Sequence, residues 1–222
     1  MRILFLGPQG SGKGTQAKKL VDKTALPHLS SGDLLRQAVA DGTPAGKRAK
    51  QYMESGKLVP DDVLIAMFGE RLPKPEFASG YILDGFPRNT AQAKALDVLL
   101  SHLNQPLTHV INLTIGDAVA MERMTGRRIC SNKSCGAIYH IKTAPPKHDA
   151  ICDICGSPLM QRSDDTPEAC RERLKIYHDE TEPLVSYYQA KRILLVVNAA
   201  LDPETVFAKI AEGLKLEKLS AK

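Results

Sequence analysis

The chain has 222 residues, of which 43% are hydrophobic and 25% are charged, and its formal net charge is +5. This composition excludes an intrinsically disordered chain, and the length suits one domain, or one core with inserts. A positive charge is compatible with nucleic-acid binding or with arginines gathered around phosphates, but no run of like charge is long enough for a nucleic-acid-binding arm.

The first predicted elements flank a glycine-rich turn. A strand is predicted over residues 2–6 and a helix over residues 16–23, and the segment between them reads Gly-Pro-Gln-Gly-Ser-Gly-Lys-Gly-Thr. This contains the pattern G-x-x-x-x-G-K of a P-loop, whose backbone N–H groups and lysine, here Lys13, bind nucleotide phosphates. Gly14 stands where most P-loops have Ser or Thr, so we do not expect the usual hydroxyl ligand of Mg²⁺. A glycine-rich turn without a ligand is the simpler alternative.

Residues 30–59 are predicted to form a small helical insert between two core elements. Its first helix begins near Ser31 and carries Arg36, and a helix start beside a guanidinium favours an anion. A plain helix cap is the alternative for Ser31. A second helix is predicted over residues 45–54. Residues 56–60 are predicted as a loop with an extended end, because the final proline disfavours helix before it.

A helix over residues 61–72, capped by its two aspartates, leads to a strand over residues 81–84. An acid at the carboxyl end of a strand near a P-loop is typical of a residue that reaches Mg²⁺ through water, and Asp84 has this position. A turn residue is the simpler alternative. Arg88 follows the turn and is suited to bind a phosphate through two hydrogen bonds.

The remaining elements alternate between strand and helix. They are predicted as a helix over residues 91–102, a strand over 110–115, a helix over 117–124, a hairpin strand over 137–141, a helix over 168–189, a strand over 193–197 and a helix over 203–216. Such alternation predicts an α/β fold with a parallel sheet covered by helices on both faces.

Four of the five cysteines form two pairs. Because the chain enters its first strand without a signal peptide and has no apolar stretch of membrane-spanning length, we expect a cytoplasmic protein with no membrane partner. In such a chain, paired cysteines favour a metal over disulfides. Cys130, Cys135, Cys152 and Cys155 therefore predict a closed, structural Zn²⁺ site, with disulfides or idle thiols as the alternative. Cys170 is expected to be a small, partly buried helix residue.

Seven segments, in this order and at these separations, carry a resemblance to a known family: GPQGSGKGTQ, LSSGDLLR, GKLVP, DGFPRN followed by Gln92, GRR before the cysteines, QRSDD and RERL. Together they resemble the adenylate kinase family, in its long bacterial form with a zinc-bearing lid. The resemblance covers essentially the whole chain. It implies a P-loop core over residues 1–29, 60–125 and 165–222, a nucleoside-monophosphate-binding insert over 30–59 and a lid over 126–164.

The resemblance also implies the reaction Mg·ATP + AMP ⇌ 2 ADP and two nucleotide sites. The ATP site comprises Gly10, Ser11, Gly12, Lys13, Gly14, Thr15, Arg127, Ile138, Tyr139 and Leu201. The AMP site comprises Ser31, Arg36, Lys57, Leu58, Val59, Gly85, Phe86, Pro87, Arg88, Gln92, Arg162 and Arg173. Gln92 is expected to read the adenine edge through paired amide hydrogen bonds. The residues implied in the transfer itself are Lys13, Asp84, Arg88, Arg123, Arg162 and Arg173.

Two positions depart from the family pattern. Ser31 stands where the family often has Thr, which keeps the hydroxyl. The first cysteine pair has the spacing C-x₄-C where related lids usually have C-x₂-C, but this spacing still suits zinc ligands. We expect Mg²⁺ to be held by ATP oxygens and water, with Asp84 and Asp33 outside this shell.

Other functions remain open at this point. Another nucleoside monophosphate kinase, for UMP/CMP or with GTP as donor, is the nearest alternative. A zinc-ribbon nucleic-acid-binding ATPase would need aromatic residues interleaved with basic ones, yet Tyr139 is the only aromatic residue between the cysteine pairs. We therefore expect ATP and AMP as partners, no nucleic acid, and a monomer, which is the default for a hinged enzyme.

Overall fold

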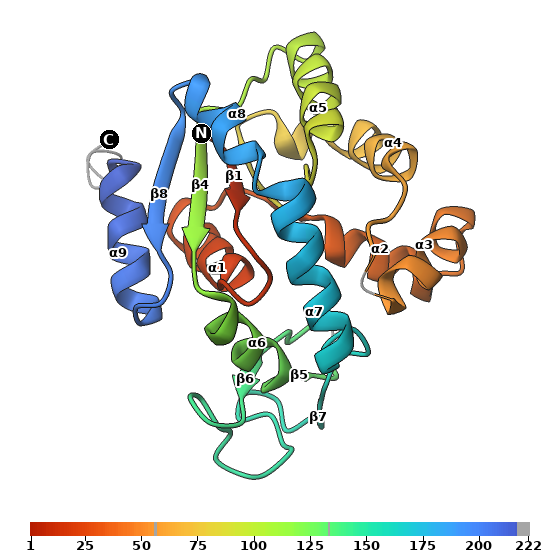
Figure 1. Cartoon of the computed structure of the whole chain (residues 1–222), viewed down its shortest axis with the longest axis vertical. Coiled ribbons are helices and arrows are strands. Elements are labelled where there is room, and N and C mark those ends of the chain that lie inside the picture. Colours follow the sequence, from red (N-terminus) through yellow and green to blue (C-terminus); the bar gives the residue numbers. More distant parts are fainter. Residues whose placement is uncertain (56, 133, 217–222) are drawn as a thin grey trace.

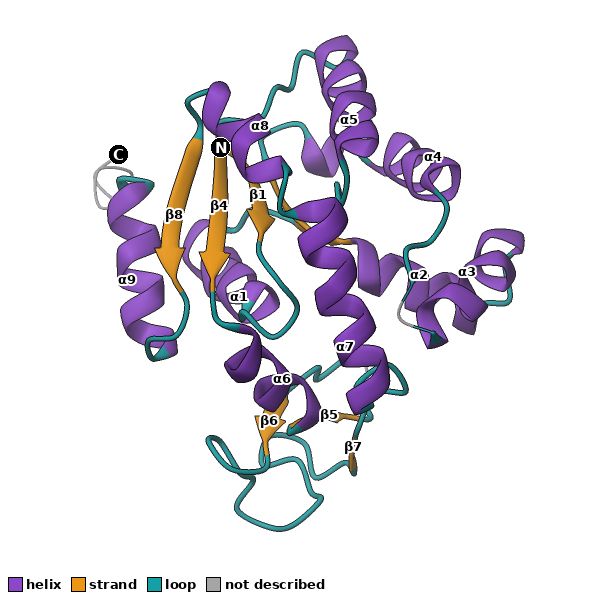
Figure 2. Cartoon of the chain, viewed as in Figure 1, coloured by secondary structure: helices purple, strands orange, loops and turns teal. Residues whose placement is uncertain are grey.

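A computed structural model describes residues 1–55, 57–132 and 134–216 of the chain. Its centre is a five-stranded parallel sheet with the strand order β2-β3-β1-β4-β8. The strands are β1 (Arg2–Leu6), β2 (His28–Ser30), β3 (Tyr81–Asp84), β4 (His109–Thr114) and β8 (Leu194–Asn198). Figure 2 shows that β1, β4 and β8 run in the same direction, so their carboxyl ends meet at one edge of the sheet.

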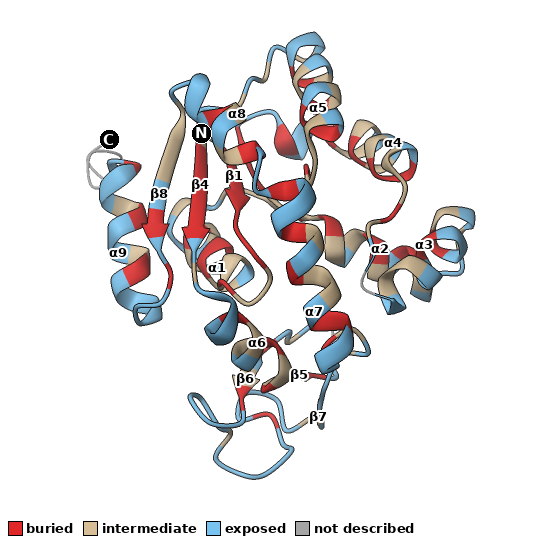
Figure 3. Cartoon of the chain, viewed as in Figure 1, coloured by how far each residue is buried: buried red, intermediate tan, exposed pale blue. Residues whose placement is uncertain are grey.

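Helices cover both faces of this sheet, because successive side chains of each strand point to opposite faces. Ile3 and Phe5 pack with α1 (Lys13–Thr24) and α9 (Pro203–Gly213). Leu4 and Leu6 pack on the other face. That face is covered by α4 (Asp61–Arg71), α5 (Thr90–His102) and α8 (Leu184–Ala190). The predicted fold class is therefore confirmed, and Figure 3 shows β1 and β4 buried between partly exposed helices.

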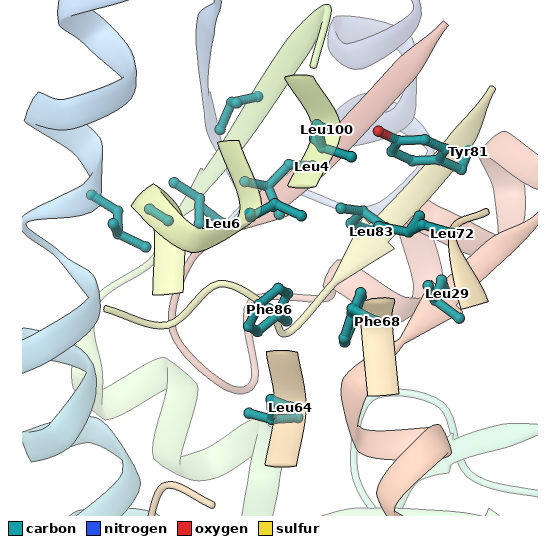
Figure 4. Packing of buried hydrophobic residues seen from close by; sticks show 14 of the residues in the cluster. Leu4, Leu6, Leu29, Leu64, Phe68, Leu72, Tyr81, Leu83, Phe86 and Leu100 are labelled. Atoms are coloured by element: carbon teal, nitrogen blue, oxygen red, sulfur yellow. The ribbon is translucent and has the colours of Figure 1, made fainter. Parts of the chain in front are cut away.

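The core on the α4 face holds the turn that follows β3. Phe86 of this turn is 1% exposed and stacks on Phe68 of α4, with ring centroids 4.3 Å apart. Figure 4 shows Phe86 and Phe68 beside Leu64 and Leu83. Burying two aromatic rings in this way fixes the turn against the helix, so that the polar residues around Phe86 have defined positions.

Two smaller parts extend from the core (Figure 1). One contains α2 (Ser31–Ala40) and α3 (Pro44–Glu54), which pack on each other. The other lies beyond the carboxyl ends of β1 and β4 and contains an antiparallel sheet with the order β6-β5-β7. Its strands are β5 (Arg127–Cys130), β6 (Ile138–His140) and β7 (Leu159–Met160), and α6 (Asp117–Thr125) and α7 (Pro167–Ile176) connect it to the core.

The predicted long helix over residues 168–189 is wrong. The chain instead forms α7, a π-helical turn over Tyr177–Thr181 and then α8. Pro183 explains the interruption, because proline has no N–H to donate and its ring crowds the carbonyl group of the residue four positions earlier. A π-turn accommodates such a mismatch within a helical segment.

Other differences concern short elements and the start of α4. The short strand β2 and the 3₁₀ turn Pro75–Phe77 were not predicted, because three residues carry no periodicity. Pro60, not an aspartate, occupies the cap position of α4. Strands β5 and β7 were missed, whereas the predicted hairpin strand is confirmed as β6, which pairs antiparallel with β5. Gly56 and residues 217–222 lie outside the described residues.

Among the helices of the described residues, none is both long enough and apolar enough to cross a membrane.

Candidate functional site

The glycine-rich loop between β1 and α1 curls around the side chain of Lys13. Gly10 has φ +82, and a Cβ atom there would lie 2.6 Å from the carbonyl oxygen of Ala120, so only glycine fits. The Lys13 Nζ donates hydrogen bonds to the carbonyl oxygens of Gly7 and Pro8, at 2.8 and 2.9 Å. The loop therefore has the shape of a P-loop with its lysine folded into it, and Gly14 and Thr15 lie in the first turn of α1.

Two features of this loop favour an anionic ligand. Burial, together with the nearby charges of Arg88, Arg173 and Arg127, lowers the pKa of Lys13 to about 8, while Asp84 opposes the shift. The buried Ser11 Oγ has no hydrogen-bond partner within the described part of the chain. Such a group is costly unless a ligand or water satisfies it.

Asp84 lies at the carboxyl end of β3, directly beside the strand that leads into the loop. Asp84 pairs in register with Phe5 of β1, which places the carboxylate next to the glycine-rich turn. The His28 Nε2 lies 3.9 Å from the Asp84 carboxylate. Ligands of parallel α/β sheets bind at this edge, so Asp84 has the position expected of an acid near a nucleotide.

A pocket lies between α2, the end of α3, the loop before α4, the turn after β3 and α7. Its lining contains residues that are far apart in the sequence: Ser31, Gly32, Leu35, Arg36, Met53, Lys57, Leu58, Val59, Leu64, Arg88, Asp164 and Arg173. Most of the predicted AMP-site residues are thus brought together. Sequence reasoning did not name Gly32, Leu35, Met53, Leu64 or Asp164 as site residues.

Ser31 and Arg88 are both anchored on the carbonyl oxygen of Gly85. The Ser31 Oγ donates to it at 2.7 Å, and the Arg88 Nε donates to it at 2.7 Å. Gly85 has φ +76, and a Cβ atom there would lie 2.5 Å from the Ser31 Oγ. Ser30 is the residue that caps α2, so the alternative that Ser31 is a plain cap is wrong.

Burial also affects the arginines of this region. It lowers the pKa of Arg88 to about 10, with Arg173 as the next cause. It lowers the pKa of Arg162 to about 10, where Arg127 and Arg36 add to the effect. The guanidinium groups therefore repel one another, and this repulsion would be relieved by a polyanion.

Two aspartates partly balance this charge. The fully buried Asp165 accepts hydrogen bonds from the Nε and Nη2 of Arg127 at 2.9 and 2.5 Å. Arg173 Nη1 lies 3.1 Å from the Asp164 carboxylate and 3.5 Å from that of Asp165. The buried Arg162 Nε has no hydrogen-bond partner among the described residues. One arginine in the cluster thus keeps a donor for a ligand.

Gln92 is fully buried, with both ends of its amide bonded within the protein. Its Oε1 accepts from the backbone N–H of Arg88 at 2.7 Å, and its Nε2 donates to the Asp61 carboxylate at 2.6 Å. The Asp61 carboxylate also accepts from the Asn89 Nδ2 at 3.2 Å. An adenine contact by Gln92 therefore has only the second N–H and the second lone pair of the amide to use, and this contact stays a prediction.

Other predicted site residues lie apart from this pocket. Arg123 donates to the carbonyl oxygen of Ala199 at 2.8 Å. The side chain of Ile138 is 48% exposed, and that of Leu201 is 37% exposed. The hydroxyl of Tyr139 accepts from the backbone N–H of Asp153 at 2.8 Å, within the small antiparallel part. The roles predicted for these residues toward ATP therefore stay predictions.

The four paired cysteines converge in the small antiparallel part. Their sulfur atoms all lie within 4.8 Å of one another, with Cys130 and Cys155 at 3.4 Å and Cys135 and Cys152 at 3.7 Å. A tetrahedral zinc ion with bonds of about 2.3 Å separates its sulfur ligands by about 3.8 Å. The donor set and its spacing therefore fit zinc. Cys170 is fully buried in α7, not partly buried as predicted.

Comparison with known proteins gives consistent matches. A sequence model of the family described as adenylate kinase matches residues 5–193. The adenylate kinase of Archaeoglobus fulgidus is 50% identical over 221 residues, which cover 100% of both chains. That of Thermodesulfovibrio yellowstonii is 51% identical over 215 residues, covering 97% of this chain and 99% of the relative. That of Desulfitobacterium hafniense is 46% identical over 215 residues, covering 97% and 98%.

Proposed function

The chain belongs to the adenylate kinase family and is a nucleoside monophosphate kinase that transfers a phosphoryl group between ATP and AMP, and from this premise we propose which residues perform the transfer. The observation that supports this proposal most directly is the pocket whose lining brings together Arg36, Arg88 and Arg173. Arg88 and Arg173 are also close enough to lower the pKa of Lys13, so the two anion-binding regions adjoin.

The ATP phosphates bind at the loop, and the AMP phosphate binds in the pocket. Lys13 leaves the carbonyl oxygens of Gly7 and Pro8 for the ATP phosphates, and the hydroxyl of Ser11 gains a partner. Arg88 presents its remaining N–H groups to the AMP phosphate. This arrangement is supported by the buried, unpaired polar atoms and by the mutual repulsion of the cations.

The transfer itself needs positioning and charge neutralisation. No general base is required, because the AMP phosphate is already an anionic nucleophile. Positive charge around the moving group comes from Lys13, Arg36, Arg88, Arg123, Arg127, Arg162 and Arg173. Arg127 and Arg173 exchange the carboxylates of Asp164 and Asp165 for phosphate oxygens as the site fills. Mg²⁺ would be bound as part of Mg·ATP and would supply charge that neutralises the phosphates, and Asp84 and Asp33 would contact it through water.

Water must be excluded during the transfer, or ATP would be hydrolysed. We assign this task to closure of the insert over residues 30–59 and of the lid over residues 126–164 onto the remaining core. The composition of the pocket supports this assignment, because its lining joins Arg36 of the insert, Arg88 of the core and Asp164 of the lid.

Zinc is assigned a structural role in the lid. The buried cluster of the lid consists of Cys130, Ala137 and Cys152, with only a few partly buried neighbours. So little apolar burial does not hold a segment of this size together, and a zinc ion bound by four thiolates supplies the missing stability. We also propose that the enzyme is cytoplasmic and acts as a monomer. Size-exclusion chromatography tests the oligomeric state.

The test of the proposed function is phosphoryl-acceptor dependence. Purified protein is given Mg·ATP with AMP, UMP, CMP or GMP, and ADP formation is followed by a coupled assay. We expect rapid turnover with AMP and little with the others. Equal or faster turnover with UMP or CMP would favour the alternative kinase, and turnover with no acceptor would contradict the proposal.

A further inference from the structure

The side-chain amide of Gln92 lies between a hydrogen-bond donor at its oxygen end and a hydrogen-bond acceptor at its nitrogen end. The backbone N–H of Arg88 can only donate, so the atom 2.7 Å away must be the amide oxygen. The Asp61 carboxylate can only accept, so the atom 2.6 Å away must be the amide nitrogen. A flipped amide would place two acceptors against each other and two donors against each other. The two contacts together therefore fix one orientation.

Of these two partners, only Asp61 contributes a side chain, so it is the one that a substitution can replace. It lies in the first turn of α4, where the positive end of the helix favours a carboxylate. It also accepts from the Asn89 Nδ2, and the Asn89 Oδ1 accepts from the backbone N–H of Gln92 at 2.8 Å. Asp61 thus connects the first turn of α4 to the first turn of α5, and its own position is well defined.

The fixed orientation has a consequence for base recognition. An amide uses its oxygen to accept from the N6 amino group of adenine and its nitrogen to donate to N1. Hypoxanthine has the opposite pattern, with an acceptor at O6 and a donor at N1, and guanine shares that pattern. These bases would need the flipped amide, which Asp61 opposes.

We propose that Asp61 is a specificity-determining residue that holds the Gln92 amide in the orientation suited to adenine and unsuited to 6-oxopurines. This rests on the proposed function, in which Gln92 reads the base of the acceptor nucleotide. Asp61 itself does not touch the substrate; it is a positioning residue that acts through Gln92.

The test compares AMP with IMP as phosphoryl acceptor, because the two differ at the base edge that the amide reads. We expect Asp61→Asn to lower the ratio of kcat/KM for AMP to kcat/KM for IMP by about tenfold or more, since an asparagine side chain can donate or accept and leaves the Arg88 N–H as the one described contact that still opposes the flipped amide. Asp61→Ser, whose hydroxyl is equally indifferent and is well tolerated at helix starts, should lower the ratio in the same direction.

Asp62→Asn is the matched control. Asp62 is the next residue of the same helical turn, but its side chain is 65% exposed and pairs with Arg48 at 3.1 Å. It should keep the wild-type ratio. A purely structural role for Asp61 would lower kcat/KM equally for both acceptors, and an unchanged ratio in folded Asp61→Asn and Asp61→Ser would overturn the inference. Failure of the proposed function would look different, because the wild-type protein would then not phosphorylate AMP.

Discussion

Lys13 is a cation that the fold makes difficult to keep charged, since burial and neighbouring arginines lower its pKa to about 8. Because the pKa of Lys13 is lowered on folding, its charged form destabilises the folded protein below pH 8. This destabilisation is relieved as the pH rises from 8 towards 10.5, the ordinary pKa of lysine. A polyphosphate beside Lys13 would raise its pKa again, because a nearby negative charge favours the charged ammonium.

We therefore predict that ATP binding takes up protons near pH 8. About half of the free protein has a neutral Lys13 at that pH, so binding should draw in about half a proton at this site, and affinity for ATP should fall as pH rises above 8. Calorimetric titrations in two buffers with different ionisation enthalpies measure the uptake. The Lys13→Arg variant stays charged and should lose this uptake; if it takes up as many protons as the wild type, another group is responsible.

Arg88 should matter for turnover far more than for folding. Its remaining N–H groups are free for a phosphate, whereas its Nε is held by Gly85. We predict that Arg88→Ala lowers kcat/KM for AMP by roughly 10²-fold or more, since charge-assisted contacts in the transition state are lost. Steady-state kinetics with varied AMP measures this. Arg48→Ala removes an exposed arginine paired with Asp62 and serves as the control, with kinetics close to wild type.

Asp165 illustrates the cost of a buried counter-ion. Replacing it with Asn would leave Arg127 and Arg173 without their fully buried partner. We predict that Asp165→Asn lowers the free energy of unfolding by about 3 kcal/mol, as is typical when one member of a buried ion pair is removed. Urea denaturation measures the loss. Asp179→Asn, which breaks an exposed pair with Lys175, should leave the midpoint nearly unchanged, and an equal loss in both variants would refute the argument.

Among the elements, we expect the small antiparallel part, our proposed lid, to depend on a metal ion at its cysteine cluster more than on packing. Its strands β5, β6 and β7 are short, and its buried cluster contains two of the four cysteines. The core sheet, by contrast, is covered by large apolar clusters on both faces. Metal loss should therefore unfold the lid locally and leave the core intact.

A strong chelator should then lower the melting temperature while activity at low temperature survives. The reason is that a structural zinc ion with four protein ligands has no open position for catalysis. Differential scanning calorimetry and elemental analysis, run with and without chelator, measure the effect. The Cys170→Ser variant, which should respond to the chelator as the wild type does, controls for thiol chemistry outside the cluster. Lost turnover without any thermal shift would indicate a catalytic metal. An unchanged melting curve with no bound zinc would instead show that the cysteines are thiols without a metal.

At the scale of the whole molecule, function follows from the edge of the sheet where parallel strands end. The glycine-rich loop follows β1, and the Gly85–Arg88 turn follows β3, which ends at Asp84. These two strands are neighbours in the sheet. The insert and the lid extend from the same region (Figure 1). This arrangement lets two polyanions meet over one cluster of cations while the hydrophobic core stays apart from the reaction.

The sequence by itself determined the features that depend on neighbours in the chain. The strand, glycine turn and helix around Lys13 form a local pattern, and so do the alternating core elements and the paired cysteines. Even the interruption before α8 has a local signal in Pro183, which outweighs the helical periodicity of the segment.

Only the tertiary structure decided which distant groups share a hydrogen bond. Ser31 and Gly85 are 54 residues apart, and Arg127 and Asp165 are 38 residues apart. Their contacts depend on the strand order and on the angle at which the insert and lid leave the core, and no periodicity encodes either. For the same reason the sequence could name Gln92 as a candidate reader of adenine but could not show that its amide lies between the backbone N–H of Arg88 and the carboxylate of Asp61.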